Sequence, residues 1–292
     1  MAGGNALSHG EARRSRRRYD QADYPTAGLF APFFLGVTKS ELHHAAGMRR
    51  ARSTFSCSTL TFLAGSAGPG IARSRPPAAI IRRMNERRHF DLIIFDMDGT
   101  LTIDALDFDH LRQRLGIHVQ EPVLEWIAEL PPGERESAWQ TLHEFERDGA
   151  LASELRPHAK TTLYRLQSLG VRTALLSRNS RQSVELILSR HALDFDHIAS
   201  RDDPPMKPHP ESIWQIVRRL GVELDRVLMV GDYIFDIQAA QAAGVRSVLL
   251  LEPDEPLPHF ATDADFHIRS LDDIVTLIEY PDRYAVEAKK VR

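Results

Sequence analysis

The stretch that most constrains the fold of this 292-residue chain is the sequence FDLIIFDMDGTLT at residues 90–102. Its short apolar run, Leu92–Phe95, is typical of a strand buried on both faces of a parallel sheet. Asp96 and Asp98 follow the run directly, and open α/β sheets bind their ligands at the carboxyl ends of strands. Two carboxylates this close repel each other. The stretch therefore predicts a site where a cation joins the two acids, rather than a plain strand-to-turn exit.

A second apolar run, Val171–Leu176, ends in the polar residues Ser177, Arg178 and Asn179. A hydroxyl and backbone N–H groups at a strand-to-helix junction favour an anion. A serine in this place is also a common helix cap. We therefore expect either an anion site or an ordinary N-cap at this strand end.

Two later segments carry a lysine and a second pair of acids. Lys207 lies in the loop PPMKPHPE before an expected helix over Glu211–Leu220. Prolines stiffen the loop, so this lysine suits the fixed charge of a phosphate, with a solvated loop lysine as the alternative. A third apolar run, Val227–Val230, leads into Asp232 and Asp236. A helix that began at Asp232 would place both acids on one face, although an acid near a helix N-terminus is also a good cap.

In order along the chain, these segments carry Asp-x-Asp, a hydroxyl, a lysine and Gly-Asp-x-x-x-Asp. The combination resembles the four signature motifs of the haloacid dehalogenase-like (HAD) hydrolase superfamily over roughly residues 90–280. The phosphoglycolate phosphatase-like branch is the most similar, because a helical insert separates the first two motifs. The resemblance implies an α/β fold, a Rossmann-like doubly wound parallel sheet with a small helical cap inserted after the first strand.

The resemblance also implies a phosphatase mechanism. Asp96 is expected to be the nucleophile that forms an aspartyl-phosphate, and Asp98 the general acid and base. Asp96, Asp232 and the backbone carbonyl of Asp98 are expected to bind the metal, with Asp236 orienting Lys207 or a metal-bound water. The expected phosphate-binding residues are Ser177, Arg178, Asn179 and Lys207.

The nature of the metal follows from the donor set. Asp96, Asp98 and Asp232 crowd negative charge against an anionic substrate, and a hard divalent cation with oxygen ligands, Mg²⁺ first, relieves that conflict. These motifs contain no cysteine and no paired histidines, which argues against zinc. The cofactor expected is therefore Mg²⁺.

The expected substrate is a small phosphorylated metabolite, with phosphoglycolate as the best single choice. A sugar-phosphate mutase of the same superfamily is the alternative, because it also needs the acid at Asp98. A dehalogenase, which expels halide, needs no acid there. A non-enzymatic binding protein is a further alternative, which the complete set of motifs disfavours.

Substrate choice is expected to lie in the insert, residues 104–157. The pattern predicts three helices, with Leu142, Phe145 and Leu151 packing them into a bundle. This bundle resembles the mobile cap of the superfamily, which closes over the site and excludes water. The helices are expected at Phe108–Leu115, Pro122–Leu130 and Glu134–Arg147. The residues of the insert that could read a second acidic group of the substrate are Arg112, Arg114 and His118, and Arg178, which follows Ser177 at its strand end, is the better candidate.

The chain divides into an N-terminal extension at residues 1–88, a core at 89–103 and 158–282, the cap at 104–157 and a tail at 283–292. The remaining strands are expected at His197–Ser200, Arg246–Leu251 and Asp265–Ile268, with a closing helix at Leu271–Glu279.

Residues 1–88 carry 15 Lys and Arg against 5 Asp and Glu, a net charge of +10, whereas the rest of the chain carries −13 of the total of −3. We expect the extension to be disordered. Three explanations stay open: an organellar transit peptide, a basic arm for nucleic acid or an acidic membrane face, or a true translation start at Met84. The last is favoured.

Cys57 is the one cysteine of the chain, which excludes a disulfide within one chain and is compatible with a reducing compartment. We expect a cytoplasmic protein, or an organellar one if residues 1–88 direct import. The apolar runs are too short for a membrane span. We expect no nucleic-acid partner, and the oligomeric state stays open.

Overall fold

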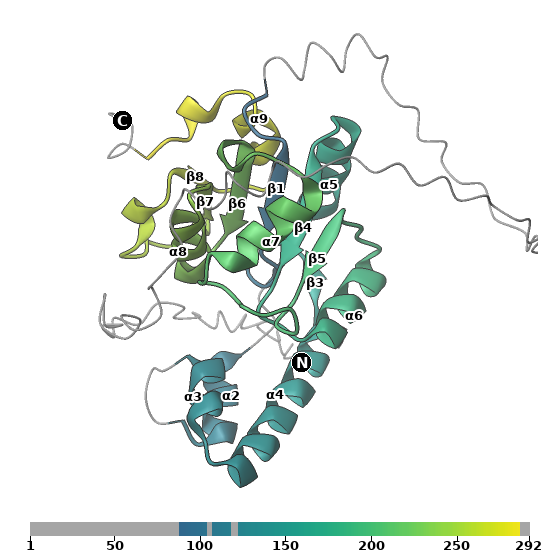
Figure 1. Ribbon diagram of the computed structural model, residues 1–292, viewed down its shortest axis with the longest axis vertical. Coiled ribbons are helices and arrows are strands. Elements are labelled where there is room, and N and C mark those ends of the chain that lie inside the picture. Colours follow the sequence, from purple (N-terminus) through teal and green to yellow (C-terminus); the bar gives the residue numbers. More distant parts are fainter. Residues whose placement is uncertain (1–87, 104–106, 118–121, 287–292) are drawn as a thin grey trace, which may run out of the picture. The chain divides into compact units, whose positions relative to one another are not determined.

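The computed structural model describes residues 88–103, 107–117 and 122–286. Six strands form one parallel sheet in the order β5-β4-β1-β6-β7-β8. This order places β1 inside the sheet, between β4 and β6, and confirms the doubly wound parallel sheet (Figure 1). The strands are β1 (Leu92–Phe95), β4 (Arg172–Leu176), β5 (His197–Ala199), β6 (Val227–Gly231), β7 (Arg246–Leu250) and β8 (Phe266–Ile268).

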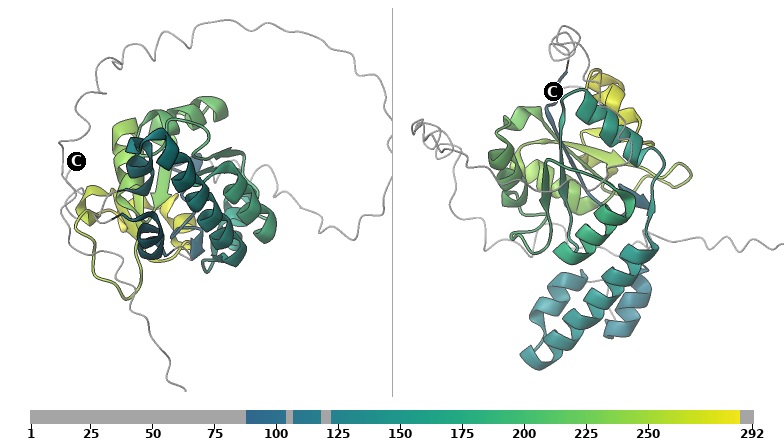
Figure 2. Two further views of the ribbon diagram at one scale, coloured as in Figure 1. Left: turned by 90° about the horizontal axis from the view of Figure 1, so that it is seen from below. Right: turned by 90° about the vertical axis from the view of Figure 1, so that its right-hand side faces the viewer.

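Helices cover both faces of the sheet (Figures 1 and 2). Successive residues of β1 point to opposite faces: Ile93 and Phe95 belong to one apolar cluster, and Leu92 and Ile94 to the other. The first cluster includes side chains of α5 (Ala159–Ser168), α6 (Arg181–His191) and α9 (Asp273–Leu277). The second includes side chains of α7 (Glu211–Leu220) and α8 (Ile234–Ala243). Short 3₁₀ turns lie at η2 (Leu224–Arg226), η3 (Ala261–Asp263) and η4 (Pro281–Arg283).

The helical insert follows β1, as predicted. It is bounded by β2 (Thr102–Ile103) and β3 (Glu154–Leu155), which pair antiparallel. Its helices have an apolar cluster of their own, centred on Leu111, Ile127 and Leu142, and α4 also packs against α6 of the core (Figure 1). The helices are α2 (Phe108–Leu115), α3 (Val123–Glu129) and α4 (Pro132–Ala152).

The third helix of the insert is longer than the predicted span Glu134–Arg147. It begins at Pro132, because proline has no N–H to lose in the first turn and its fixed φ suits that position. It ends at Ala152. The prediction that Leu151 packs in the bundle is wrong, since it is 50% exposed, whereas Leu142 is buried and Phe145 packs against the insert's cluster.

Several predictions fall outside the described residues. These include Cys57, His118, Met84 and almost all of the basic extension at residues 1–88. Among the residues that are described, no helix is both long enough and apolar enough to cross a membrane.

Candidate active site

The carboxyl ends of three neighbouring strands bring most of the predicted residues together. Because β1 pairs in register with β4 and β6, Asp96 after β1, Ser177 after β4 and Asp232 at the end of β6 emerge at one edge of the sheet. The backbone N–H of Asp96 donates to the carbonyl of Val230 in β6, at 2.9 Å. Backbone pairing alone therefore places these three residues at one edge of the sheet.

Lys207 is the buried cation of this edge. Its Nζ donates to Asp96 Oδ1 and to Asp236 Oδ1, each at 2.6 Å, and the residue is 3% exposed. Burial by itself lowers the pKa of Lys207, but the carboxylates of Asp236 and Asp96 outweigh burial and hold that pKa above its ordinary value. Burial also raises the pKa of Asp236 to about 6, although the Lys207 charge opposes the shift. Lys207 thus keeps its positive charge beside Asp96.

Asp232 lies directly against the turn that follows β1. Its Oδ1 accepts a hydrogen bond from Thr100 Oγ1 at 2.9 Å. Gly99 has a φ of +77°, and a Cβ at this position would lie 2.1 Å from Asp232 Oδ2. Glycine is therefore required at position 99 for two reasons, the left-handed backbone and the close approach of the carboxylate.

The helix after β6 does not begin at Asp232, the start that would place both acids on one face. Helix α8 begins at Ile234, and Tyr233 is its N-cap with extended backbone. The Asp236 carboxylate accepts a hydrogen bond from the Tyr233 N–H at 3.1 Å, which closes a capping box. The two acids therefore differ in role: Asp232 precedes the helix and contacts Thr100, whereas Asp236 caps the helix and binds Lys207.

Three carboxylates gather closely enough to hold a metal ion. Asp96, Asp232 and Asp236 each offer one oxygen, and these oxygens lie within 4.8 Å of one another. An all-oxygen set suits a hard divalent cation such as Mg²⁺. Asp236 is buried and bonded to Lys207, whereas Asp96 and Asp232 are both partly exposed, so the fit is best for a cation held by Asp96 and Asp232.

Asp98 is held by side chains from two segments. Asn179 Nδ2 donates to Asp98 Oδ2 at 2.6 Å, and Thr102 Oγ1 lies 3.4 Å from Asp98 Oδ1. Asn179 thus directs its side-chain amide at this acid, and its expected role toward phosphate stays a prediction. Ser177 is buried, and its Oγ accepts from the Asn179 N–H at 3.1 Å, so the hydroxyl proton is available for a further acceptor.

Arg178, another predicted phosphate ligand, points to a protein carboxylate. Its Nη2 donates to both oxygens of Glu125 in α3, at 2.7 and 2.8 Å. Its Nη1 donates to the backbone carbonyl of Lys207 at 2.6 Å. As the structure stands, these partners occupy the guanidinium that was expected to bind phosphate.

A family model described as haloacid dehalogenase-like hydrolase matches residues 90–244. The chain belongs to this family. A haloacid dehalogenase-like hydrolase domain-containing protein of Arabidopsis thaliana is 28% identical over 204 residues, which are 64% of this chain and 83% of that protein. A phosphoglycolate phosphatase of Pseudomonas savastanoi is 31% identical over 186 residues, 54% of this chain and 68% of that enzyme. The predicted family, its phosphoglycolate phosphatase-like branch and the hydrolase class are thereby confirmed.

The same fold is also found among solved structures. A hydrolase from Pseudomonas syringae aligns with a TM-score of 0.55 and 18% identity, covering 67% of this chain and 100% of that one. At this identity the likeness concerns the fold alone. It agrees with the six-stranded parallel sheet and its flanking helices.

Three groups near the hydrolase motifs escaped the sequence analysis. Arg156, after β3, donates from Nη2 to the Gly99 carbonyl and to Glu252, each at 2.6 Å. Glu146 of α4 and Arg201 form a buried ion pair. Glu125, described above, reaches Arg178 from α3. Each contact joins residues at least 53 positions apart, so no local pattern predicts it.

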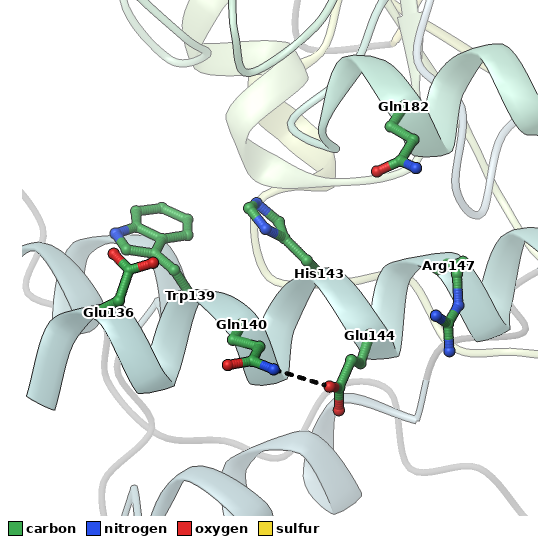
Figure 3. A pocket seen from close by; sticks show the side chains of 7 residues that line it. All are labelled: Glu136, Trp139, Gln140, His143, Glu144, Arg147 and Gln182. Carbon is green, nitrogen blue, oxygen red and sulfur yellow. Dashed lines mark hydrogen bonds between the residues drawn. The ribbon is translucent and has the colours of Figure 1, made fainter.

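The hydrolase also has a hollow that no residue of the four motifs lines. It measures about 560 Å³ and lies along α4, with one wall residue from α6 (Figure 3). Along α4, Gln140 donates to Glu144 at 3.4 Å. None of the predicted site residues lines it, so we assign it no part in the chemistry. The lining residues are Glu136, Trp139, Gln140, His143, Glu144, Arg147 and Gln182.

The basic residues expected to read the substrate from the insert have partners within it. Arg112 pairs with Asp109 at 3.1 Å, and Arg114 with Glu144 at 3.6 Å. Their role toward a substrate stays a prediction.

Proposed function

We propose that this hydrolase is a Mg²⁺-dependent phosphatase that acts on a small phosphorylated metabolite through an aspartyl-phosphate on Asp96. The observation that carries the proposal is the contact of Asp96 with the buried ammonium of Lys207, next to a second carboxylate, Asp232. A nucleophile between a fixed cation and a cation-binding carboxylate suits attack on an anionic phosphate. The buried Ser177 hydroxyl adds a neutral donor.

The covalent chemistry needs two steps. In the first, a carboxylate oxygen of Asp96 attacks phosphorus, the bond from phosphorus to the ester oxygen breaks, and the leaving oxygen takes a proton from Asp98. In the second, water gives a proton to Asp98 and attacks phosphorus, and the bond from phosphorus to the Asp96 oxygen breaks. Inorganic phosphate is released and the Asp96 carboxylate is restored. Asn179 and Thr102 orient Asp98 for both transfers.

The metal would be held by Asp96, Asp232 and the backbone carbonyl of Asp98. Bound there, Mg²⁺ would supply positive charge that offsets the charge of the phosphate oxygens. We assign Asp236 to the orientation of Lys207, because its carboxylate is buried and already accepts from that ammonium.

We propose phosphoglycolate as the first substrate to test, because phosphoglycolate phosphatases are among the relatives. The insert between β2 and β3 is proposed to be a cap that closes over the site. We propose a cytoplasmic location, since one cysteine fits a reducing compartment. An organellar location is the alternative if residues 1–88 direct import.

The test is phosphate release by the full chain from a panel of phosphorylated metabolites, with Mg²⁺ or with EDTA. We expect release that requires Mg²⁺ and that Asp96→Asn abolishes. If the folded protein released no phosphate from any compound of the panel, the proposal would be contradicted. Transfer of phosphate within a sugar phosphate would indicate a mutase.

A further inference from the structure

The guanidinium of Arg178 is fixed by the core, independently of the helical insert. Nη1 donates to the Lys207 carbonyl at 2.6 Å, and the guanidinium carbon lies 4.4 Å from the centre of the Phe235 ring. The residue itself directly follows Ser177 at the end of β4. Segments from three parts of the core thus hold this cation beside the proposed phosphate-binding groups.

The anionic partner of this cation comes from the insert. Both carboxylate oxygens of Glu125 accept from Arg178 Nη2, at 2.7 and 2.8 Å. The Arg178 side chain is 17% exposed and that of Glu125 37%, so the acid is the more accessible member. Since the core contacts hold the guanidinium in place, another carboxylate can replace Glu125 without moving Arg178.

We infer that Glu125 determines specificity by competing with a second anionic group of the substrate for Arg178. A phosphate ester whose alcohol part carries a carboxylate offers Arg178 the same charge and geometry as Glu125. Such a substrate must displace Glu125, whereas an ester of a neutral alcohol leaves the pair intact. The inference rests on the proposed phosphatase function. It adds that the site distinguishes phosphate esters whose alcohol part carries a carboxylate from those whose alcohol part is neutral.

The test compares two substrates that differ in one group. Phosphoglycolate carries a carboxylate where 2-hydroxyethyl phosphate carries a neutral CH₂OH. In the full chain with Mg²⁺, Glu125→Gln keeps the size of the side chain and removes its charge. We expect the ratio of kcat/KM, phosphoglycolate over hydroxyethyl phosphate, to rise about tenfold, mainly through a lower KM for phosphoglycolate.

Two further variants separate competition from general effects of charge. Glu129→Gln removes the same charge from an exposed position of α3, and we expect the ratio to stay at the wild-type value. The double variant Glu125→Gln/Arg178→Gln also lacks the guanidinium that would bind the substrate carboxylate. The rise in the kcat/KM ratio seen in Glu125→Gln should therefore disappear in it. A ratio that is unchanged or lower in Glu125→Gln overturns the inference, because Glu125 would then only tie the insert to the core.

A binding measurement separates this inference from the proposed function. Calorimetric titration of both compounds into Asp96→Asn, with and without Glu125→Gln, gives the affinity ratio without turnover. We expect that ratio to rise about tenfold as well. Failure of every substrate to turn over would refute the phosphatase function, whereas a binding ratio that does not rise would refute the role of Glu125.

Discussion

Replacing Gly99 by alanine tests the geometry that joins the first and last motifs. The added Cβ would lie 2.1 Å from Asp232 Oδ2 and 2.6 Å from its Cγ, whereas ordinary contact begins near 3.4 Å. The carboxylate must therefore move by about 1 Å, and a displacement of that size in an active site costs about 10²-fold in rate. It also weakens the hydrogen bond from Thr100.

The backbone adds a separate cost, because position 99 has a φ of +77°. An L-residue in this region loses about 1–2 kcal/mol of stability. Gly221→Ala is the matched control: its φ is +63°, and nothing lies within 4 Å of its added Cβ. Both variants should therefore lose the backbone share of the free energy of unfolding, with a further loss in Gly99→Ala from the displaced Asp232 carboxylate. Only Gly99→Ala should lose activity.

The assay pairs urea denaturation with phosphate release at several Mg²⁺ concentrations. We expect kcat/KM to fall about 10²-fold in Gly99→Ala, with a higher Mg²⁺ requirement, and to stay within about threefold of wild type in Gly221→Ala. Equal activity in the two folded variants would refute the reasoning, because the close approach to Asp232 would then not position the site.

Two predictions concern stability. Glu146→Gln leaves the buried guanidinium of Arg201 without its carboxylate, so urea denaturation should show that the free energy of unfolding falls by about 3–5 kcal/mol. Glu146→Leu/Arg201→Met, which replaces both charges by apolar side chains, should recover most of that loss. Equal losses in the two variants would contradict the prediction. Asp91→Asn should cost about 1 kcal/mol at neutral pH. Hydrogen bonds from Arg226 and Arg88 hold the pKa of Asp91 below its ordinary value of 3.8, so wild type loses this advantage as the pH falls below about 4. Denaturation curves of wild type and Asp91→Asn at neutral pH and below about pH 4 check this prediction. A difference in stability between them that persists at the low pH would contradict it.

The sheet could be predicted closely because its strands are buried on both faces. The continuous apolar run Leu92–Phe95 coincides with β1, and the predicted helix Glu211–Leu220 coincides with α7. Strand ends in a parallel sheet meet at one edge, so the residues that follow each run could be assigned to one site from the sequence alone.

Contacts between distant segments could not be predicted in the same way. Arg178 looked like a phosphate ligand because it follows Ser177, but its partner Glu125 lies 53 residues earlier in the chain. The start of α8 at Ile234 depends on a capping box in which Tyr233 takes the N-cap position. Tyrosine is not a residue that ordinarily signals a helix cap, so the acid at 232 was the more obvious candidate.

The central claim is that Asp96 carries the phosphoryl group during turnover. The direct measurement is to quench the full chain during steady-state turnover, reduce it with borohydride, which converts an aspartyl-phosphate to homoserine, and locate the product by peptide mass spectrometry. We predict homoserine at position 96, dependent on substrate and Mg²⁺ and absent from Asp96→Asn. Sustained phosphate release with unmodified Asp96, or with homoserine at another aspartate, would contradict the account.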